Sequence, residues 1–174
     1  MKLVKFLDKK GTLLVSDPLN QTILKNLVTS EYSTSDLATK LNIPTLKLWR
    51  KMQTLLKANM IELSRTEKVG NLEKKYYRAI ATGYIPQQLI ETKAKDQNLQ
   101  EAFDLYSEIQ NRMMTVISGF SDVPKEAHPI DYAMFANMYA FAEIFSESKT
   151  QSKLLELKKK LAEYQKQNVH VSRV

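Results

Sequence analysis

The sequence predicts a mainly α-helical protein with one small β-hairpin. Apolar residues recur at helical spacing along most of the 174-residue chain, and two short alternating segments flank a glycine near residue 70. Positive charge is confined to the first half: residues 1–80 hold fifteen Lys or Arg against seven Asp or Glu, and residues 81–174 hold eleven against twelve. These observations together predict an N-terminal domain of residues 1–83 and an entirely helical region of residues 84–174.

The first helix is predicted over residues 18–29. Asp17 is a good N-cap residue, and Pro18 suits the first helical position, where its missing N–H costs nothing. Ahead of this helix, the apolar run at residues 13–15 predicts a short strand.

Two more helices follow closely. Ser33 and Asp36 have the spacing of a capping box, which predicts a short helix up to residue 41. Pro44 then breaks the chain and suits the start of a third helix over residues 45–58. That helix has an apolar stripe on one face and a basic, hydroxylic face opposite, so it can enter a groove while packed on a core.

A β-hairpin is predicted after the third helix. Residues 60–64 and 74–80 form its strands, residues 67–71 its polar tip, and Asn59 a left-handed cap before it. Helix, turn, basic helix and hairpin in this order make a winged helix-turn-helix. Modules of this kind place their second helix in the DNA major groove.

Three longer helices are predicted in the C-terminal region, over residues 87–119, 130–145 and 150–167. The middle one is apolar nearly all round and must be covered on more than one side. Its neighbours could make it core, a dimer interface or the lining of an effector pocket, and these alternatives stay open. The residues concerned are Phe103, Tyr106, Met113, Tyr132, Met134, Phe135, Met138, Phe141, Phe145, Leu154, Leu157 and Leu161.

Composition argues against several classes of function. The absence of Cys excludes a disulfide framework, a thiolate metal site and a Cys nucleophile. The two imidazoles, His128 and His170, are far apart in sequence, and four Gly leave little room for a phosphate-binding loop. We therefore expect no enzyme activity, no cofactor and no metal. The sequence has no apolar run of the ~18 residues that a membrane helix needs, and we expect a cytoplasmic protein.

Four segments carry a family resemblance: LVSDPLNQTILKNLV (14–28), STSDLATKLNI (33–43), LKLWRKMQTLLKANMIE (46–62) and KKYYRAI (74–80). Over roughly residues 13–79 the chain resembles the ArsR-type winged helix-turn-helix repressors. The Ser-Asp-Pro opening and the Tyr-Tyr-Arg strand favour this family over MarR-like regulators. The resemblance implies a DNA-binding repressor.

The chain departs from that family at informative positions. Ser33 and Ser35 stand where metal-sensing members carry Cys, and neutral hydroxyls are poor ligands for soft metals, so we expect no thiolate metal sensing. Trp49 replaces a frequent Ser in the third helix, and Asn59 replaces a frequent Gly after it. The change at Trp49 argues against transferring the family's operator sequence to this chain.

The candidate DNA contacts lie on the second and third helices and on the hairpin. Arg50 suits a bidentate contact to guanine O6 and N7, whereas the hairpin lysines would contact phosphates without specifying sequence. Trp49 either touches a thymine methyl or sugar or belongs to the core. The full set is Thr34, Ser35, Lys40, Pro44, Thr45, Lys47, Trp49, Arg50, Lys51, Thr54, Arg65, Lys68, Lys74 and Lys75.

The sequence therefore predicts a transcription regulator that binds double-stranded DNA as a homodimeric repressor on a palindromic operator. A small-molecule effector is compatible with the helical region but has no support in the sequence. The alternative is a winged-helix protein-interaction module in a transcription assembly, with only nonspecific DNA binding. Both hypotheses compete with a simpler explanation, in which the basic face of the helix at residues 45–58 is only exposed to solvent and binds no partner.

Overall fold

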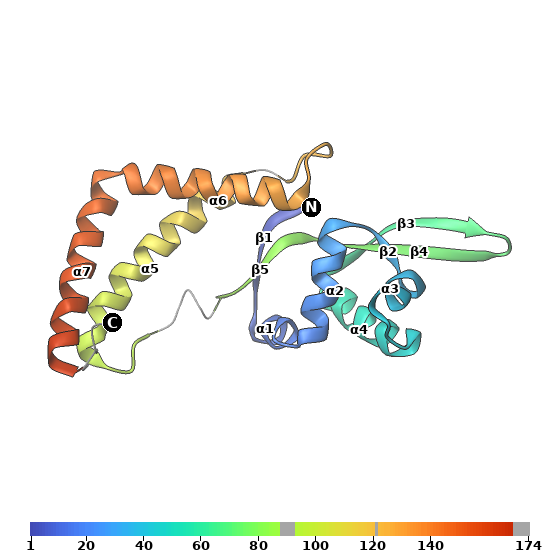
Figure 1. Cartoon of the computed structure of the whole chain (residues 1–174), viewed down its shortest axis with the longest axis horizontal. Helices are drawn as coiled ribbons and strands as arrows, with labels where there is room; N and C mark the ends of the chain where they lie inside the picture. The colour runs from blue at the N-terminus through green and yellow to red at the C-terminus, as the bar shows by residue number, and fades with distance from the viewer. Residues whose placement is uncertain (88–92, 121, 169–174) are drawn as a thin grey trace. The chain divides into compact units, whose positions relative to one another are not determined.

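The computed structural model describes residues 1–87, 93–120 and 122–168 and is mainly helical, with two small sheets (Figure 1). The chain divides into two compact units. One, here called the N-terminal unit, comprises Met1–Pro86 and Ser121–Met134. The other, the helical unit, comprises Gln87–Phe120 and Phe135–Val174.

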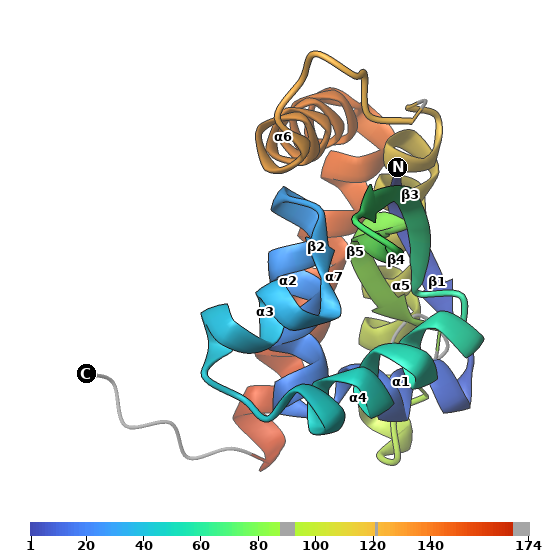
Figure 2. The same cartoon turned by 90° about the vertical axis from the view of Figure 1, so that its right-hand side faces the viewer.

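The N-terminal unit contains a winged helix-turn-helix (Figure 2). An antiparallel sheet with strand order β2-β4-β3 accompanies its helices, and β1 and β5 form a separate parallel pair. The elements in chain order are β1 (Lys2–Leu7), α1 (Lys9–Val15), α2 (Pro18–Thr29), β2 (Tyr32–Ser33), α3 (Thr34–Leu41), α4 (Thr45–Lys57), β3 (Ile61–Val69), β4 (Leu72–Ala79) and β5 (Ala81–Pro86).

The predicted helix ends are confirmed by their capping contacts. Asp17 accepts hydrogen bonds from the backbone N–H groups of the first turn of α2, with Pro18 in the first helical position. Ser33 accepts from the N–H of Asp36 at the start of α3. Asn59 has a φ of 54°, the left-handed cap predicted for it.

The core of the N-terminal unit forms where the helices and the base of the hairpin meet. Side chains on α2, α3 and α4 that recur at helical spacing are almost completely buried there, and the residues at the start of the hairpin add two more. These buried residues include Ile23, Leu27, Leu37, Leu48, Met52, Leu55, Met60 and Ile61.

Residues 13–15 are not the strand that the apolar run predicted, because they form the end of α1. Asp8 caps that helix: its carboxylate accepts a hydrogen bond from the N–H of Gly11 at 2.7 Å. The strands of this region are β1 and β5 instead, paired in parallel with Lys2 opposite Ala81. A pairing between segments this far apart in sequence leaves no local turn pattern to predict it.

The hairpin is longer than predicted. Strands β3 and β4 continue to Val69 and from Leu72, so that only Gly70 and Asn71 make the turn. Gly70 has a φ of 62°, which glycine adopts without strain. Cross-strand pairs extend the ladder through residues that composition alone marked as a polar tip.

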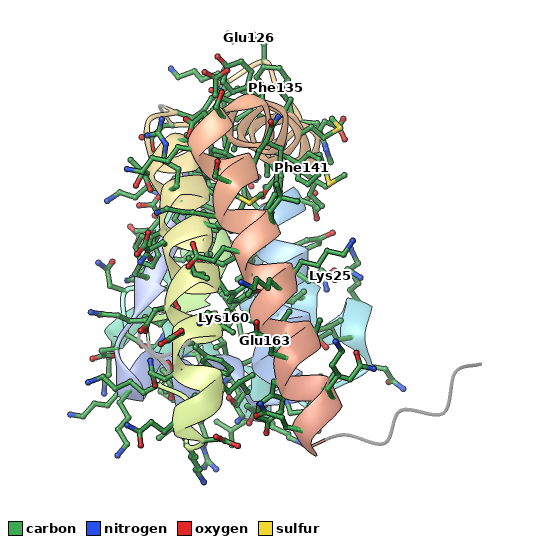
Figure 3. All side chains as sticks on the ribbon, turned by 90° about the vertical axis from the view of Figure 1, so that its left-hand side faces the viewer. Lys25, Glu126, Phe135, Phe141, Lys160 and Glu163 are labelled. Carbon is green, nitrogen blue, oxygen red and sulfur yellow. The ribbon has the colours of Figure 1, made fainter. Side chains whose placement is uncertain are left out.

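Helices α5 (Gln97–Ser118) and α7 (Ser148–Asn168) lie side by side in the helical unit (Figure 1). Helix α5 starts at Gln97, not at residue 87, and residues 88–92 lie outside the described part of the chain. Ion pairs join the two helices through Glu101 with Lys160 and Glu108 with Lys153. Figure 3 labels Lys160 on the α7 side that faces α5. 

Helix α6 (Pro129–Ser146) begins in the N-terminal unit and continues into the helical unit. Its small residues Ala136 and Ala140 are buried with Ile144, whereas several of its aromatic and Met side chains are exposed. Over the part of the chain that the structure describes, no helix has both the length and the apolar character needed to cross a membrane.

The end of α4 is held by side chains from the parallel strand pair. Lys5 on β1 donates hydrogen bonds to the carbonyl oxygens of Asn59 at 2.5 Å and Ala58 at 3.4 Å. The hydroxyl of Tyr84 on β5 donates to the carbonyl of Met60, and burial raises the pKa of Tyr84 to about 12. Ala58, Asn59 and Met60 directly follow the last residue of α4, so these contacts tie the C-terminal end of the helix to the parallel strand pair.

Replacing Lys5 by Met should lower the free energy of unfolding by about 1 kcal/mol, because a charged donor to the α4 terminus is lost while the side-chain volume is kept. Urea unfolding followed by circular dichroism measures this. Lys2→Met on the same strand is the control, since Lys2 is exposed. Equal losses in the two variants would contradict the capping role.

Candidate nucleic-acid interface

Helix α4 has one buried face and one exposed face. Leu48, Met52 and Leu55 are at most 1% exposed. Their burial contributes roughly 2 kcal/mol for each side chain. The opposite face carries Lys47, Arg50 and Thr54, which are exposed and follow one another at helical spacing, and Thr45 is exposed in the first turn of the helix.

Trp49 lies outside the core. Its side chain is 48% exposed, and that of the neighbouring Leu46 is 60% exposed. Of the two roles that the sequence left open for Trp49, the core role is therefore excluded. Leu46 is an exposed apolar residue one turn before it that was not among the predicted DNA contacts, although helical spacing places it away from the stripe of Leu48, Met52 and Leu55.

Lys51 is only half-exposed, although the sequence placed it with the groove-facing residues. Its Nζ lies 2.5 Å from a carboxylate oxygen of Asp17 at the start of α2. The hydrogen bond from Lys51, followed by that from the N–H of Asn20, lowers the pKa of the Asp17 carboxyl. Asp17 thus caps α2 and anchors α4 at the same time.

On helix α3, the side chains predicted to contact DNA are partly buried or hydrogen-bonded within the protein. Thr34 is half-buried, while Ser35 and Pro44 are exposed. The Ser35 hydroxyl lies 3.0 Å from that of Ser33, which is buried and caps the helix. Lys40 is exposed, and its Nζ donates to the Tyr32 hydroxyl at 2.5 Å.

Two of the hairpin cations that were predicted to contact DNA have ion-pair partners within the protein. Arg65 pairs with Glu31 and Glu67, both at 3.0 Å, and its guanidinium lies 3.6 Å from the centre of the Tyr76 ring. Lys74 pairs with Asp36 at 2.8 Å, which ties β4 to α3. The hydrogen bond from Lys74 lowers the pKa of the Asp36 carboxyl.

Five of the predicted contact residues keep an uncompensated charge. Among the described residues, none forms an ion pair with Lys40, Lys47, Arg50, Lys68 or Lys75, and all five side chains are exposed. A cation outside any intramolecular ion pair can bind a phosphate without first breaking a salt bridge. The structure thus separates these five from the paired Lys51, Arg65 and Lys74.

The residues proposed for an effector pocket or dimer interface do not converge on one enclosed cavity. Phe135 and Tyr139 pack edge-on against Phe120 at centroid distances of 5.9 and 5.5 Å, and Phe141 lies 4.3 Å from Phe145. Met134, Met138 and Phe141 are more than half exposed, as is Tyr106. Phe103, Met113 and Tyr132 are half-buried. Leu154, Leu157 and Leu161 line an open groove of about 830 Å³ along α7.

A separate hollow of about 380 Å³ lies in the N-terminal unit. Leu24 and Lys25 of α2, Tyr84 of β5 and Ile130 of α6 are among the residues that line it. None of the residues predicted for an effector lines this hollow. The sequence gave no signal for it, since its walls come from elements that only tertiary structure brings together.

The described ranges contain no group of three or more His, Asp or Glu side chains placed to hold a metal ion. The exposed His128 has its Nδ1 3.5 Å from a carboxylate oxygen of Asp131.

Comparison with known proteins gives little further information. No family model matches the chain, and no curated protein matches it. A solved structure of Bacillus subtilis PadR in complex with operator DNA is similar with a TM-score of 0.34 and 15% identity, covering 81% of this chain and 99% of that chain. That score is too low to establish a common fold. The winged helix-turn-helix described above follows from the elements of this chain, and the ArsR likeness remains a resemblance in its residues.

Replacing Asp17 by Ala should lower the free energy of unfolding at pH 7 by about 1 kcal/mol, because α2 loses its cap and Lys51 its partner. The pKa of Asp17 is lower in the folded state than its usual 3.8, so its stabilisation is present above that pH and is lost as the pH falls through the folded-state value. Urea titrations at pH 7 and pH 3 measure both effects.

The difference between wild type and Asp17→Ala should therefore narrow at pH 3. Asp122→Ala serves as the control, since Asp122 is exposed and lies in neither α2 nor α4. A difference of the same size at both pH values would show that the carboxylate charge plays no part.

Proposed function

We propose that this protein is a sequence-specific regulator of transcription that binds double-stranded DNA. The observation that carries the proposal is the exposed face of α4, where Lys47, Arg50 and Thr54 stand in one row while the opposite face is buried. In a helix-turn-helix this second helix is the one that enters the major groove. The DNA-binding domain is then the winged part of the N-terminal unit.

Arg50 is the residue we assign to base recognition. Its guanidinium is exposed and has no ion-pair partner within the described residues, so both of its donor pairs are available to guanine O6 and N7. Thr45 in the first turn of α4 is close to a phosphate or base edge in such an orientation. Trp49 and Leu46, exposed beside them, supply apolar contacts to a thymine methyl or a sugar.

Lys47, Lys68, Lys75 and Lys40 are assigned to phosphates. These contacts supply affinity and orientation but no sequence information. Lys51, Arg65 and Lys74 act differently in this proposal, because their ion pairs with Asp17, Glu31 and Asp36 hold α4 and the hairpin in place.

The regulator is proposed to act as a homodimer through its helical region. Met134, Met138 and Phe141 follow one another at helical spacing on α6, and each is more than half exposed. These three side chains carry no charge. A two-fold axis would bring them against the same three side chains of a second copy. Two copies of α4 would then enter successive major grooves about 34 Å apart, on a palindromic operator, and repress transcription by excluding polymerase.

Signal sensing by thiolate-bound metal has no place in the proposal. Ser33 stands at one of the two Cys positions of metal-sensing ArsR-type repressors. It is buried, and its hydroxyl caps α3 by accepting a hydrogen bond from the N–H of Asp36. Neutral hydroxyls are poor ligands for soft metals.

The function is tested by selecting tight-binding duplexes from random DNA and measuring their retention in gel shifts at several salt concentrations. A footprinted, palindromic sequence is the expected result. Binding that is weak, shows no footprint and vanishes with salt would instead indicate a protein-interaction module, and no binding at low salt would exclude a DNA-binding role.

Arg50→Ala and Lys68→Ala should have different effects on the selected duplex. Arg50→Ala should reduce discrimination between the selected and a mutated duplex by about tenfold or more, because one base contact is lost. Lys68→Ala should weaken binding to both duplexes alike and reduce the slope of log K against log salt by about one. Titrations of both duplexes by fluorescence anisotropy measure this, and the assignment fails if Arg50→Ala affects both duplexes equally.

Met138→Glu should convert the protein from dimer to monomer in sizing with light scattering at micromolar concentration, because two buried carboxylates would face each other across the axis. Glu143→Lys, an exposed change on the same helix with two units of altered charge, is the control and should leave the dimer intact. A wild-type monomer would exclude the model with two half-sites.

A further inference from the structure

The hollow of about 380 Å³ in the N-terminal unit has apolar walls that come from several elements. Leu24 and Val28 of α2 are buried, and Ile130 of α6 is 40% exposed. Val15, the last residue of α1, adds to the apolar lining. A volume of this size lies within the range of about 300–1,000 Å³ that is usual for small-molecule sites in proteins.

The polar side chains of the lining have partners within the protein. The Tyr84 hydroxyl donates to the carbonyl of Met60, and the Thr82 hydroxyl donates to a β1 carbonyl at 2.6 Å. The side-chain amide of Gln21 donates to the carbonyl at the end of α1 at 2.7 Å. These hydrogen bonds join the elements that form the walls, so the hollow needs no rearrangement of its polar groups to accept an apolar ligand.

Lys25 is the charged residue in the lining of the hollow. It shares one face of α2 with Gln21 and Val28, because the three positions recur at spacings of four and three. Its side chain is exposed and forms no ion pair with any residue that the structure describes. The hollow therefore combines apolar walls with one positive charge that has no carboxylate beside it.

This combination selects a ligand with an apolar body and a single negative charge. A lone ammonium balances one unit of charge, whereas a phosphate carries nearly two and is usually held by several donors. An alkyl chain gains about fourfold in affinity for each CH₂ group that it buries. A lysine can keep its ammonium in water while its stem lies along apolar surface, so the carboxylate of the ligand would stay at the open side of the hollow.

We propose that the hollow is a binding site for a small aliphatic monocarboxylate of the medium-chain fatty acid class. The carboxylate lies beside the ammonium of Lys25, and the alkyl chain lies against Leu24, Val28 and Ile130. The site contains none of the residues assigned to DNA, so the inference does not depend on the proposed function. It adds the binding of a small molecule to that function.

Binding is measured by calorimetry with the full-length protein and octanoate, below the concentration at which octanoate forms micelles. Octanoate should bind at one site per chain. Hexanoate should bind roughly tenfold more weakly, because two buried CH₂ groups are lost. Octylammonium has the same alkyl chain with the opposite charge, and it should bind roughly threefold to tenfold more weakly than octanoate.

Lys25→Met removes the charge and keeps the side-chain volume, so this variant should bind octanoate and octylammonium with similar affinity. Lys57→Met is the matched control. Lys57 is also an exposed lysine of a helix in the same unit, but it is not in the lining of the hollow. This control should keep the wild-type preference for octanoate, and circular dichroism checks that both variants are folded.

The position of the ligand is measured by methyl NMR of the full-length protein. Octanoate should shift the methyl signals of Leu24 and Ile130. Shifts confined to the methyl groups of Met134 and Met138, which are exposed on α6, would overturn the site, because they would show adsorption to open apolar surface.

Three further results would overturn the proposal. They are an absence of saturable octanoate binding, equal binding of octanoate and octylammonium by wild type, and an unchanged preference for octanoate in Lys25→Met. None of these results bears on DNA binding, which the duplex titrations measure without any carboxylate ligand. Failure of the proposed function would likewise leave the calorimetry and the methyl shifts unchanged.

Discussion

The burial of one face of α4 is the constraint on which the N-terminal unit depends. Leu48, Met52 and Leu55 are almost fully buried, and this fixes the rotation of the helix about its own axis. Rotation in turn decides which side chains face outward. The exposed row with Arg50 is therefore a consequence of core packing, and any change in that core would move the row.

Polar contacts fix the helix where apolar packing cannot. Asp17 binds Lys51 on one side of α4, and Lys5 binds the carbonyls at its C-terminal end. Apolar burial is non-directional, so it permits the helix to slide along its axis, whereas hydrogen bonds with fixed geometry do not. The combination presents the outer face of α4 in one position, which lowers the cost of ordering it on binding.

Ion pairs join elements within each unit. In the helical unit, acidic residues of α5 pair with lysines of α7, and Arg112 pairs with Glu147. In the N-terminal unit, Lys51 pairs with Asp17 and Lys74 with Asp36. Figure 3 shows the contrast with α6, where the labelled Phe135 and Phe141 belong to a helix that is nearly free of charge. Apolar surface of this kind is typical of association between proteins.

The helix-turn-helix could be predicted from the amino-acid sequence alone, because each of its parts has a local cause. Asp17 with Pro18, Ser33 with Asp36, and Asn59 are capping residues whose effect does not depend on distant contacts. Helical spacing also predicted the buried face of α4. Those residues fixed the fold of this segment and placed Arg50 on its outer face.

Contacts between residues far apart in the chain could be seen only in the folded structure. The parallel pairing of β1 with β5, the ion pairs that occupy Lys51, Arg65 and Lys74, and the exposure of Trp49 all arise from such contacts. A single sequence records the identity of a lysine but not the carboxylate beside it in space. For that reason the sequence predicted which cations lie in the winged segment, and only the structure separated those that hold the fold from those left free for a partner.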